Sequence, residues 1–211
     1  MHYQRFASDI HETAMIGDLK TYLMKPFAFD VVLRVRAGSN LQAGEYFGNF
    51  TTLNNTDYRF GTLDCDQSFA VSFFHDGKLD EKEQVSFQCA VLHTTSTGQR
   101  RIRVMNLQVP VAISMPVIFR MSDLDAILHF SIKRALHQAP TASLSSLMTY
   151  VQVKSAQSLA SYRKSCSPNT PVSQLLLPDG LKLLPLYCLA LSKSIPFAPP
   201  GMKCLLSSTF H

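Results

Sequence analysis

Arg34 and Arg36 stand two residues apart in the segment Leu33-Arg34-Val35-Arg36, whose alternation of apolar and polar residues predicts a β-strand. Because successive side chains of a strand point to opposite faces, both guanidinium groups lie on one face, and Leu33 and Val35 lie on the other. Like charges on one face repel each other unless they are solvated or paired, and a carboxylate relieves that repulsion through bidentate hydrogen bonds. The pair is therefore either a solvated strand face or a binding site for an acidic ligand, and the alternation fits both.

A second basic pair, Arg101 and Arg103, stands at the start of a later predicted strand. Ile102 and Val104 lie on the opposite face of that strand, and Arg100 falls in the preceding turn. We interpret this pair as a solvated strand face that forms a secondary basic surface. The chain has 20 basic and 15 acidic residues, and the resulting formal charge of +5 favours anionic partners, although solubility alone also explains an excess of this size.

The sequence contains no motif of a catalytic or metal-binding site. It has no glycine-rich phosphate loop, no Gly-x-Ser-x-Gly turn and no His-Glu-x-x-His helix. None of the seven histidines stands at metal-ligand spacing with a cysteine or a second histidine. The neighbours His75 and Asp76 precede Gly77 and are typical of a hairpin turn rather than of a catalytic pair. We therefore predict a chain that is not an enzyme and that has no catalytic residue, metal ligand or cofactor.

The cysteines and the apolar runs indicate the compartment. Five cysteines without a Cys-x-x-Cys pair are typical of a reducing environment, since an odd number fits a closed disulfide framework poorly. No apolar run approaches the roughly eighteen residues of a membrane-spanning helix, and the first residues lack a signal-peptide pattern. We therefore expect a cytoplasmic chain.

The elements that must position the arginine pairs follow from the apolar periodicity. Helical spacing runs over residues 5–24 and is ended by Pro26. Beyond it, short alternating or β-branched runs separated by turn signals are typical of an antiparallel sandwich. The predicted strands span residues 29–36, 45–50, 69–74, 85–94 and 102–109.

After Pro116 the spacing becomes helical again. Ser122-Asp123 and Thr141 are candidate N-caps, and Pro185 either kinks the last helix or lies in its first turns. A proline-rich tail follows at residues 195–201. The predicted helices span residues 122–137, 141–166 and 179–193. The fold class is therefore α+β, an antiparallel β-sandwich followed by an all-α helical domain.

Several segments resemble, in the same order and at similar separations, those of the Sec24 family, the cargo-binding adaptor subunit of the coat protein complex II (COPII). The related GTPase-activating coat subunit has a strand similar to residues 99–104, but the segments around residues 29–50 fit the cargo-binding subunit better. The segments are FDVVLRVR (29–36), YFGNF (46–50), LDCD (63–66), GQRRIRV (98–104), AQSLASYRK (156–164), and QLLLP followed by LKLLPL (174–186).

The resemblance implies a division into domains. Residues 1–24 correspond to the last helix of a truncated trunk domain with a von Willebrand A-like fold, residues 25–118 to the β-sandwich, and residues 119–211 to the helical domain, truncated at its C-terminal side. The family's zinc finger, most of its trunk and its gelsolin-like domain lie outside this sequence. We therefore expect a fragment without a cofactor, whose sandwich lacks the strands that the family supplies from upstream.

The resemblance also implies a function in endoplasmic reticulum (ER) to Golgi transport. The family is an adaptor that binds acidic sorting signals in the cytosolic tails of membrane cargo and SNARE proteins, together with its partner, the GTPase-activating COPII subunit. It is cytoplasmic and peripheral on the ER membrane and on COPII vesicles. Arg34 and Arg36 occupy the strand that matches the family's basic cargo pocket, whose remaining arginines come from the trunk.

The alternative function is that of a basic β-sandwich that binds nucleic acid or anionic lipid nonspecifically. Arg101 and Arg103 are flanked by aliphatic residues and not by the aromatic residues on which bases stack. We therefore expect no specific nucleic acid partner.

Overall fold

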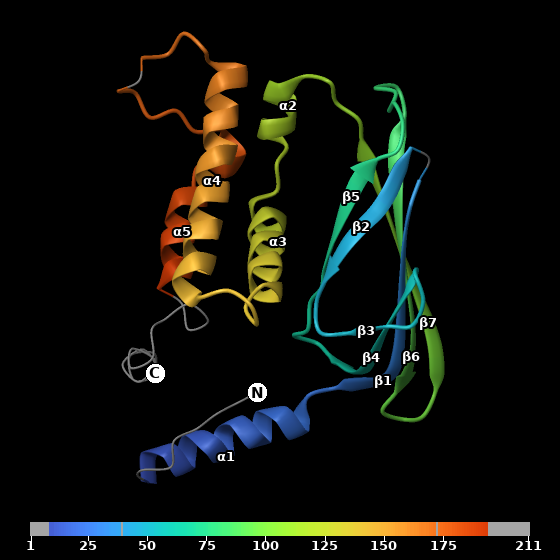
Figure 1. Ribbon diagram of the computed structural model, residues 1–211. Coiled ribbons are helices and arrows are strands. Elements are labelled where there is room, and N and C mark those ends of the chain that lie inside the picture. Colours follow the sequence, from blue (N-terminus) through green and yellow to red (C-terminus); the bar gives the residue numbers. More distant parts are fainter. Residues whose placement is uncertain (1–8, 39, 172, 194–211) are drawn as a thin grey trace. The chain divides into compact units, whose positions relative to one another are not determined.

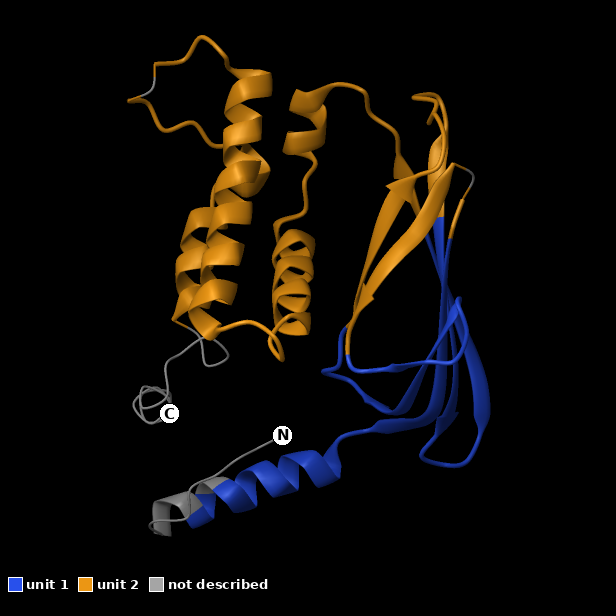
Figure 2. Cartoon of the chain, viewed as in Figure 1, with its two compact units in different colours: residues 1–36, 49–68, 87–107 blue, residues 37–48, 69–86, 108–211 orange. Residues whose placement is uncertain are grey.

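The computed structural model describes residues 9–38, 40–171 and 173–193 (Figure 1). The chain divides into two compact units, shown in Figure 2. Unit 1 comprises residues 1–36, 49–68 and 87–107, and unit 2 comprises residues 37–48, 69–86 and 108–211. The units interleave along the sequence, because each consists of three separate segments of the chain.

The described strands form two sheets. The larger sheet has five strands in the order β3-β4-β1-β6-β7, and the smaller one pairs β2 with β5. The registers of β1 with β4, of β3 with β4 and of β2 with β5 are antiparallel. The strands are β1 (Phe27–Ala37), β2 (Leu41–Phe47), β3 (Thr51–Thr52), β4 (Asp57–Asp64), β5 (Ala70–His75), β6 (Gln84–Thr95) and β7 (Arg100–Pro110). Together with the helices that follow, they confirm the predicted α+β fold class.

Strand β1 buries one face and exposes the other, as its sequence predicts. Val31 and Leu33 are buried, whereas Arg36 is exposed and Arg34 is half-buried. The edge strand β7 is different, because all 11 of its residues are exposed, including the apolar Ile102 and Leu107. Backbone groups on the outer side of an edge strand are open to pairing with another chain.

One predicted strand was wrong in its position, and two strands of the structure were missed. The predicted strand 45–50 lies at 41–47 instead, because Asn40, with a φ of 66°, ends a turn that places Leu41 opposite His75. The short strand β3 and the strand β4 were not predicted. Asp57 and Gly61 weaken the β pattern of β4, since aspartate and glycine are depleted in strands.

The helices comprise α1 (Asp9–Met24) in unit 1 and, in unit 2, α2 (Met115–Arg120), α3 (Leu124–His137), α4 (Leu144–Cys166), the 3₁₀ turn η1 (Asp179–Leu181) and α5 (Leu184–Ser192). The described helices include none that is both long enough and apolar enough to cross a membrane. Residues 5–8 and 195–201, for which a helix and a tail were predicted, lie outside the described residues.

The helix ends differ in part from the prediction. Asp123 caps α3 by accepting hydrogen bonds from the backbone amides of Asp125 and Ala126, as expected. The cap of α4 is Ser143 and not Thr141, because the Thr141 hydroxyl donates to the carbonyl of Gln138 and so closes the preceding turn. Helix α2 was not predicted, and the predicted helix 179–193 is divided into η1 and α5, with Pro185 in the first turn of α5.

The core of the helical part lies among α3, α4, η1 and α5. Leu147 and Leu184 are almost completely buried there, and apolar burial of this kind supplies most of the stability of packed helices. The buried residues are Leu128, Ala135, Leu147, Val151, Leu181, Leu184 and Cys188.

Candidate functional site

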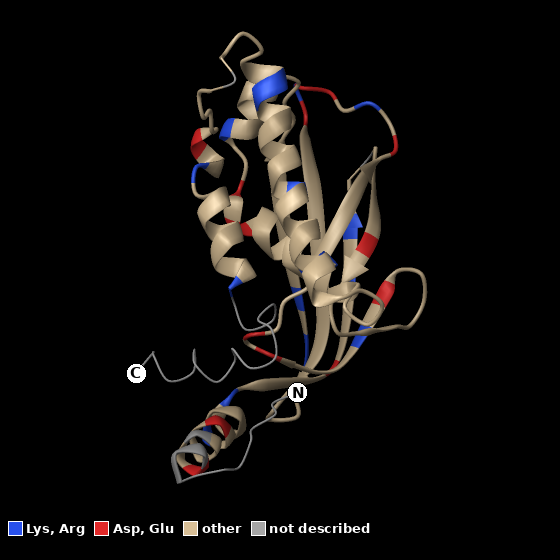
Figure 3. Cartoon of the chain, turned by 60° about the vertical axis from the view of Figure 1, so that its left-hand side comes forward, with Lys and Arg blue, Asp and Glu red and all other residues tan. Residues whose placement is uncertain are grey.

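The polar face of β1 and β4 carries the candidate site. The register places Arg34 opposite Asp57 and Val32 opposite Arg59, so these side chains share the face that points away from the buried Val31. We call the six charged residues of this region the arginine face; it includes Asp30 and Arg100, whose contacts are described below. They are Asp30, Arg34, Arg36, Asp57, Arg59 and Arg100. Figure 3 marks the basic and acidic positions along the chain.

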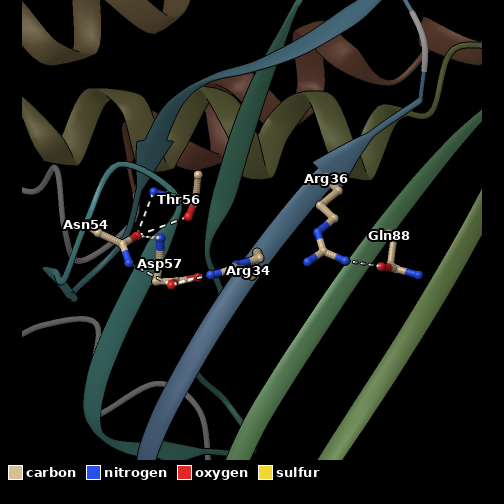
Figure 4. A network of polar contacts seen from close by, with 6 residues as sticks. All are labelled: Arg34, Arg36, Asn54, Thr56, Asp57 and Gln88. Carbon is tan, nitrogen blue, oxygen red and sulfur yellow. Dashed lines mark hydrogen bonds and ion pairs between the residues drawn. The ribbon is translucent and has the colours of Figure 1, made fainter.

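Arg34 forms a bidentate ion pair with Asp57 (Figure 4). Its Nε donates to Oδ1 and its Nη2 donates to Oδ2, both at 2.5 Å. The Asp57 side chain is 10% exposed and that of Arg34 is 40% exposed, so the carboxylate lies within the fold and the guanidinium reaches the surface. This fork of two parallel charge-assisted bonds fixes the guanidinium geometry.

The loop before β4 holds Asp57 in place. Asn54 Nδ2 donates to Asp57 Oδ2 at 2.9 Å, and Asn54 Oδ1 accepts hydrogen bonds from the backbone amides of Thr56 and Asp57. Phe50 packs edge-to-face on Tyr58, with ring centroids 4.8 Å apart. The Asp57 carboxylate is therefore positioned by the loop as well as by Arg34.

The hydrogen bonds to Asp57 also control its ionisation. The bond from Arg34, followed by the bond from Asn54, lowers the pKa of Asp57 from 3.8 to about 2. The same contact raises the pKa of Arg34 above its ordinary value. Both groups are therefore charged at neutral pH, and each largely neutralises the other.

Arg36 has a different environment. Its Nη1 donates to Oε1 of Gln88 at 3.2 Å, and Gln88 Nε2 in turn donates to Asn106 Oδ1 at 3.0 Å. Among the residues that the structure describes, this is the one hydrogen bond of Arg36, and it goes to a neutral group. The side chain is thus held in position across β1, β6 and β7 while its charge has no carboxylate bonded to it.

Asp30 joins the remaining two arginines. Arg59 Nη2 donates to Asp30 Oδ1 at 2.8 Å, and Arg100 Nη1 lies 3.0 Å from Asp30 Oδ2. Arg100 also donates to the carbonyl of Asp30. Asp30 has a φ of 45°, a left-handed conformation that is uncommon for a residue other than glycine. The hydrogen bond from Arg59, and after it the charge of Arg100, lowers the pKa of Asp30.

The family model for the Sec23/Sec24 β-sandwich domain matches residues 28–112, and that for the Sec23/Sec24 helical domain matches residues 123–204. Protein transport protein SEC24 B of Arabidopsis thaliana is 38% identical over 199 residues. The chain belongs to the Sec24 family. Human protein transport protein Sec24D is 34% identical over 192 residues.

A solved structure supports the same assignment. The crystal structure of the human COPII-coat protein Sec24c superimposes on 90% of this Sec24-family chain with a TM-score of 0.79 and 32% sequence identity. The region aligned with SEC24 B covers 94% of this chain but only 18% of SEC24 B. The region superimposed on Sec24c covers 25% of the Sec24c chain. The chain therefore spans about a fifth of the length of the Sec24 relatives that it matches. The division at residues 1–24, 25–118 and 119–211 stays a prediction.

The predicted site residues of this Sec24-family chain fall into two groups. Arg34 and Arg36 lie together on the arginine face, as their spacing predicted. Arg101 and Arg103 are exposed on β7, and alternation puts them on the face opposite to that of Arg100. Arg100 lies at the start of β7 and not in the preceding turn, and it joins the arginine face through Asp30. The binding role of Arg34 and Arg36 stays a prediction.

Sequence reasoning missed the partners of the arginines in this Sec24-family chain. Asp57 follows Asn54-Asn55-Thr56, a run of turn-forming residues that signals a tight loop before a strand. That signal was available, but the pairing of Arg34 with Asp57 depends on strand order. Among the described residues, no group of three or more His, Cys, Asp or Glu side chains is arranged to hold a metal ion.

Proposed function

We propose that this Sec24-family chain takes part in COPII vesicle transport from the ER to the Golgi as a segment of a cargo adaptor. In this proposal it binds acidic sorting signals in the cytosolic tails of membrane cargo and SNARE proteins through Arg34 and Arg36. Its coat partner is the GTPase-activating COPII subunit, and it works in the cytoplasm, peripherally on the ER membrane and on vesicles. It acts as a structural adaptor and not as an enzyme.

One observation carries this proposal. Arg36 is exposed, its position is fixed by Gln88, and its charge is not matched by a bonded carboxylate among the described residues. A guanidinium has five donors, so Arg36 retains most of its hydrogen-bonding capacity for a carboxylate. Arg34 uses its Nε and one Nη2 donor for Asp57 and keeps its Nη1 donors for a second acceptor. The pair thus offers donors on one face of one strand.

Binding of a peptide carboxylate here would use charge-assisted hydrogen bonds, which are shorter and stronger than neutral ones. A peptide with glutamine in place of its acidic residue lacks the negative charge and so loses the charge-assisted hydrogen bonds to the arginines. The site should therefore be specific for an acidic signal. We therefore expect affinity to depend on the acidic residue of the peptide and to decrease as salt screens the charges.

The test is peptide binding by the 211-residue chain. A fluorescent peptide that contains leucines and a glutamate is titrated with wild type and with the double variant Arg34→Ala/Arg36→Ala. We expect the double variant to lose at least tenfold in affinity, the size expected for losing hydrogen bonds to a charged group. A peptide with glutamine in place of glutamate measures the contribution of the acidic charge.

The matched control is Arg101→Ala/Arg103→Ala. It removes the same number of charges, but from the face of β7 that is opposite to Arg100 and the arginine face. This variant also tests the alternative function, nonspecific binding of nucleic acid or anionic lipid. A nonspecific basic surface would lose affinity in both double variants, ignore the Glu→Gln change and decrease steeply with salt. Equal losses in the two double variants would refute the acidic-signal proposal.

A further inference from the structure

The arginine face already contains a carboxylate bound to one of the two arginines of the proposed site. Asp57 occupies the Nε and Nη2 donors of Arg34 from the same strand face on which a bound tail would lie (Figure 4). An acidic ligand that approaches Arg34 therefore meets a guanidinium whose charge is shared with an internal carboxylate. Arg36 meets the same ligand without a bonded carboxylate, since its hydrogen bond goes to the neutral Gln88 and the Asp57 charge acts on it only through space, more weakly than on Arg34.

We propose, on the basis of the function proposed above, that Asp57 is an internal counter-charge that limits the affinity of Arg34 and Arg36 for acidic tails. In consequence, Arg36 provides the main attraction for the bound carboxylate. Asp57 thus sets the strength of binding without touching the ligand.

The geometry makes this counter-charge permanent. Asp57 is held by two bonds from Arg34 and one from Asn54, and its side chain is 10% exposed. Asn54 is itself held by the loop, because its Oδ1 accepts hydrogen bonds from the backbone amides of Thr56 and Asp57. A ligand carboxylate would therefore have to displace Asp57 from a partner that is fixed in position. The ligand must therefore bind Arg34 from the other edge of the guanidinium, with Asp57 still in place.

The size of the effect follows from Coulomb's law. Two carboxylates on opposite edges of one guanidinium lie about 6–7 Å apart, and their repulsion in water weakens binding about threefold. A lower local dielectric constant makes the repulsion stronger. Removal of the Asp57 charge should therefore tighten the binding of an acidic peptide at least threefold and leave a neutral peptide unaffected.

The experiment compares Asp57→Asn with wild type in the 211-residue chain, at low salt, with the glutamate peptide and its glutamine counterpart. We expect at least threefold tighter binding of the glutamate peptide and a steeper decrease with salt. Glu81→Gln, an exposed acid in the connection between β5 and β6, is the control for net charge. An equal gain in Glu81→Gln would show a general charge effect and overturn the proposal.

A second pair of variants covers the case in which Asp57→Asn does not fold. Arg34→Gln leaves Asp57 without its cation, whereas Arg34→Gln/Asp57→Asn replaces one neutral pair by another. We expect the double variant to bind the glutamate peptide at least threefold more tightly than Arg34→Gln. No gain in a folded double variant would overturn the counter-charge.

The two proposals fail in different ways. If wild type prefers the glutamate peptide but removal of the Asp57 charge brings no gain, only the counter-charge is wrong. If neither wild type nor Asp57→Asn distinguishes the two peptides, the acidic-signal function and the counter-charge are both wrong. If only Asp57→Asn distinguishes them, the counter-charge is supported, because the internal carboxylate then masks the site.

Discussion

Acid should weaken the fold at a pH set by the Arg34–Asp57 pair. Asp57 has a pKa of about 2 in the folded chain, against an ordinary value of 3.8. A lowered carboxyl pKa stabilises the folded state above the unfolded pKa, and this stabilisation is lost as the pH decreases from about 4 to about 2. At neutral pH the contribution is complete and does not vary.

The magnitude can be expressed in protons. At pH 3 a carboxyl of pKa 3.8 is about six-sevenths protonated, whereas one of pKa about 2 is roughly one-tenth protonated. Unfolding at pH 3 should therefore take up about 0.8 proton at Asp57, and almost none at pH 6. Asp30, Asp66 and Asp179 also have lowered pKa values and add to the total in wild type.

The assay is urea-induced unfolding of wild type and Asp57→Asn between pH 6 and pH 2.5. The difference between the slopes of unfolding free energy against pH isolates Asp57, because the other acids are common to both proteins. Glu81→Gln serves as the control for the loss of an exposed acid. Identical pH dependence in wild type and Asp57→Asn would show that the pKa of Asp57 is not lowered in the folded chain and would refute the reasoning.

Two further predictions concern the helical core. Leu147 is 2% exposed, and Leu147→Ala should lower the free energy of unfolding by about 2–5 kcal/mol in urea titrations. The control Val153→Ala, at an exposed position of the same helix, should lower it by well under about 1 kcal/mol. Similar losses in the two variants would contradict the packing of Leu147 in the core. Gly180→Ala should cost about 1–3 kcal/mol, because a Cβ atom would lie 2.9 Å from the Ser122 carbonyl oxygen. Gly61→Ala meets nothing within 4 Å and is its control in thermal unfolding, where equal shifts would exclude steric crowding at residue 180.

The common face of Arg34 and Arg36 could be predicted because strand alternation is a local property. Val31 and Leu33 are apolar and alternate with the arginines, so their burial fixes the direction of the arginines. The cap at Asp123 could also be predicted, since a capping side chain bonds to backbone only two and three residues away. In each case the deciding interaction lies within a few residues of the sequence.

The charge state of the face could not be predicted in the same way. Asp57 is separated from Arg34 by 23 residues and Arg100 from Asp30 by 70, so both contacts depend on which strands are neighbours. A periodic pattern specifies which side of a strand is buried but not the order of strands in a sheet. The two co-facial charges of the sequence thus become one neutral pair and one exposed cation in the fold.

The exposed edge strand β7 has a consequence for the recovery of folded protein. Pairing between the β7 edges of two chains is a bimolecular reaction, so its rate increases with the square of concentration, whereas folding of one chain is first order. Arg101 and Arg103 oppose such pairing, because like charges on two approaching edges repel each other. Dilution should therefore increase the yield of monomer, and high salt should reduce it by screening the repulsion that these two arginines supply.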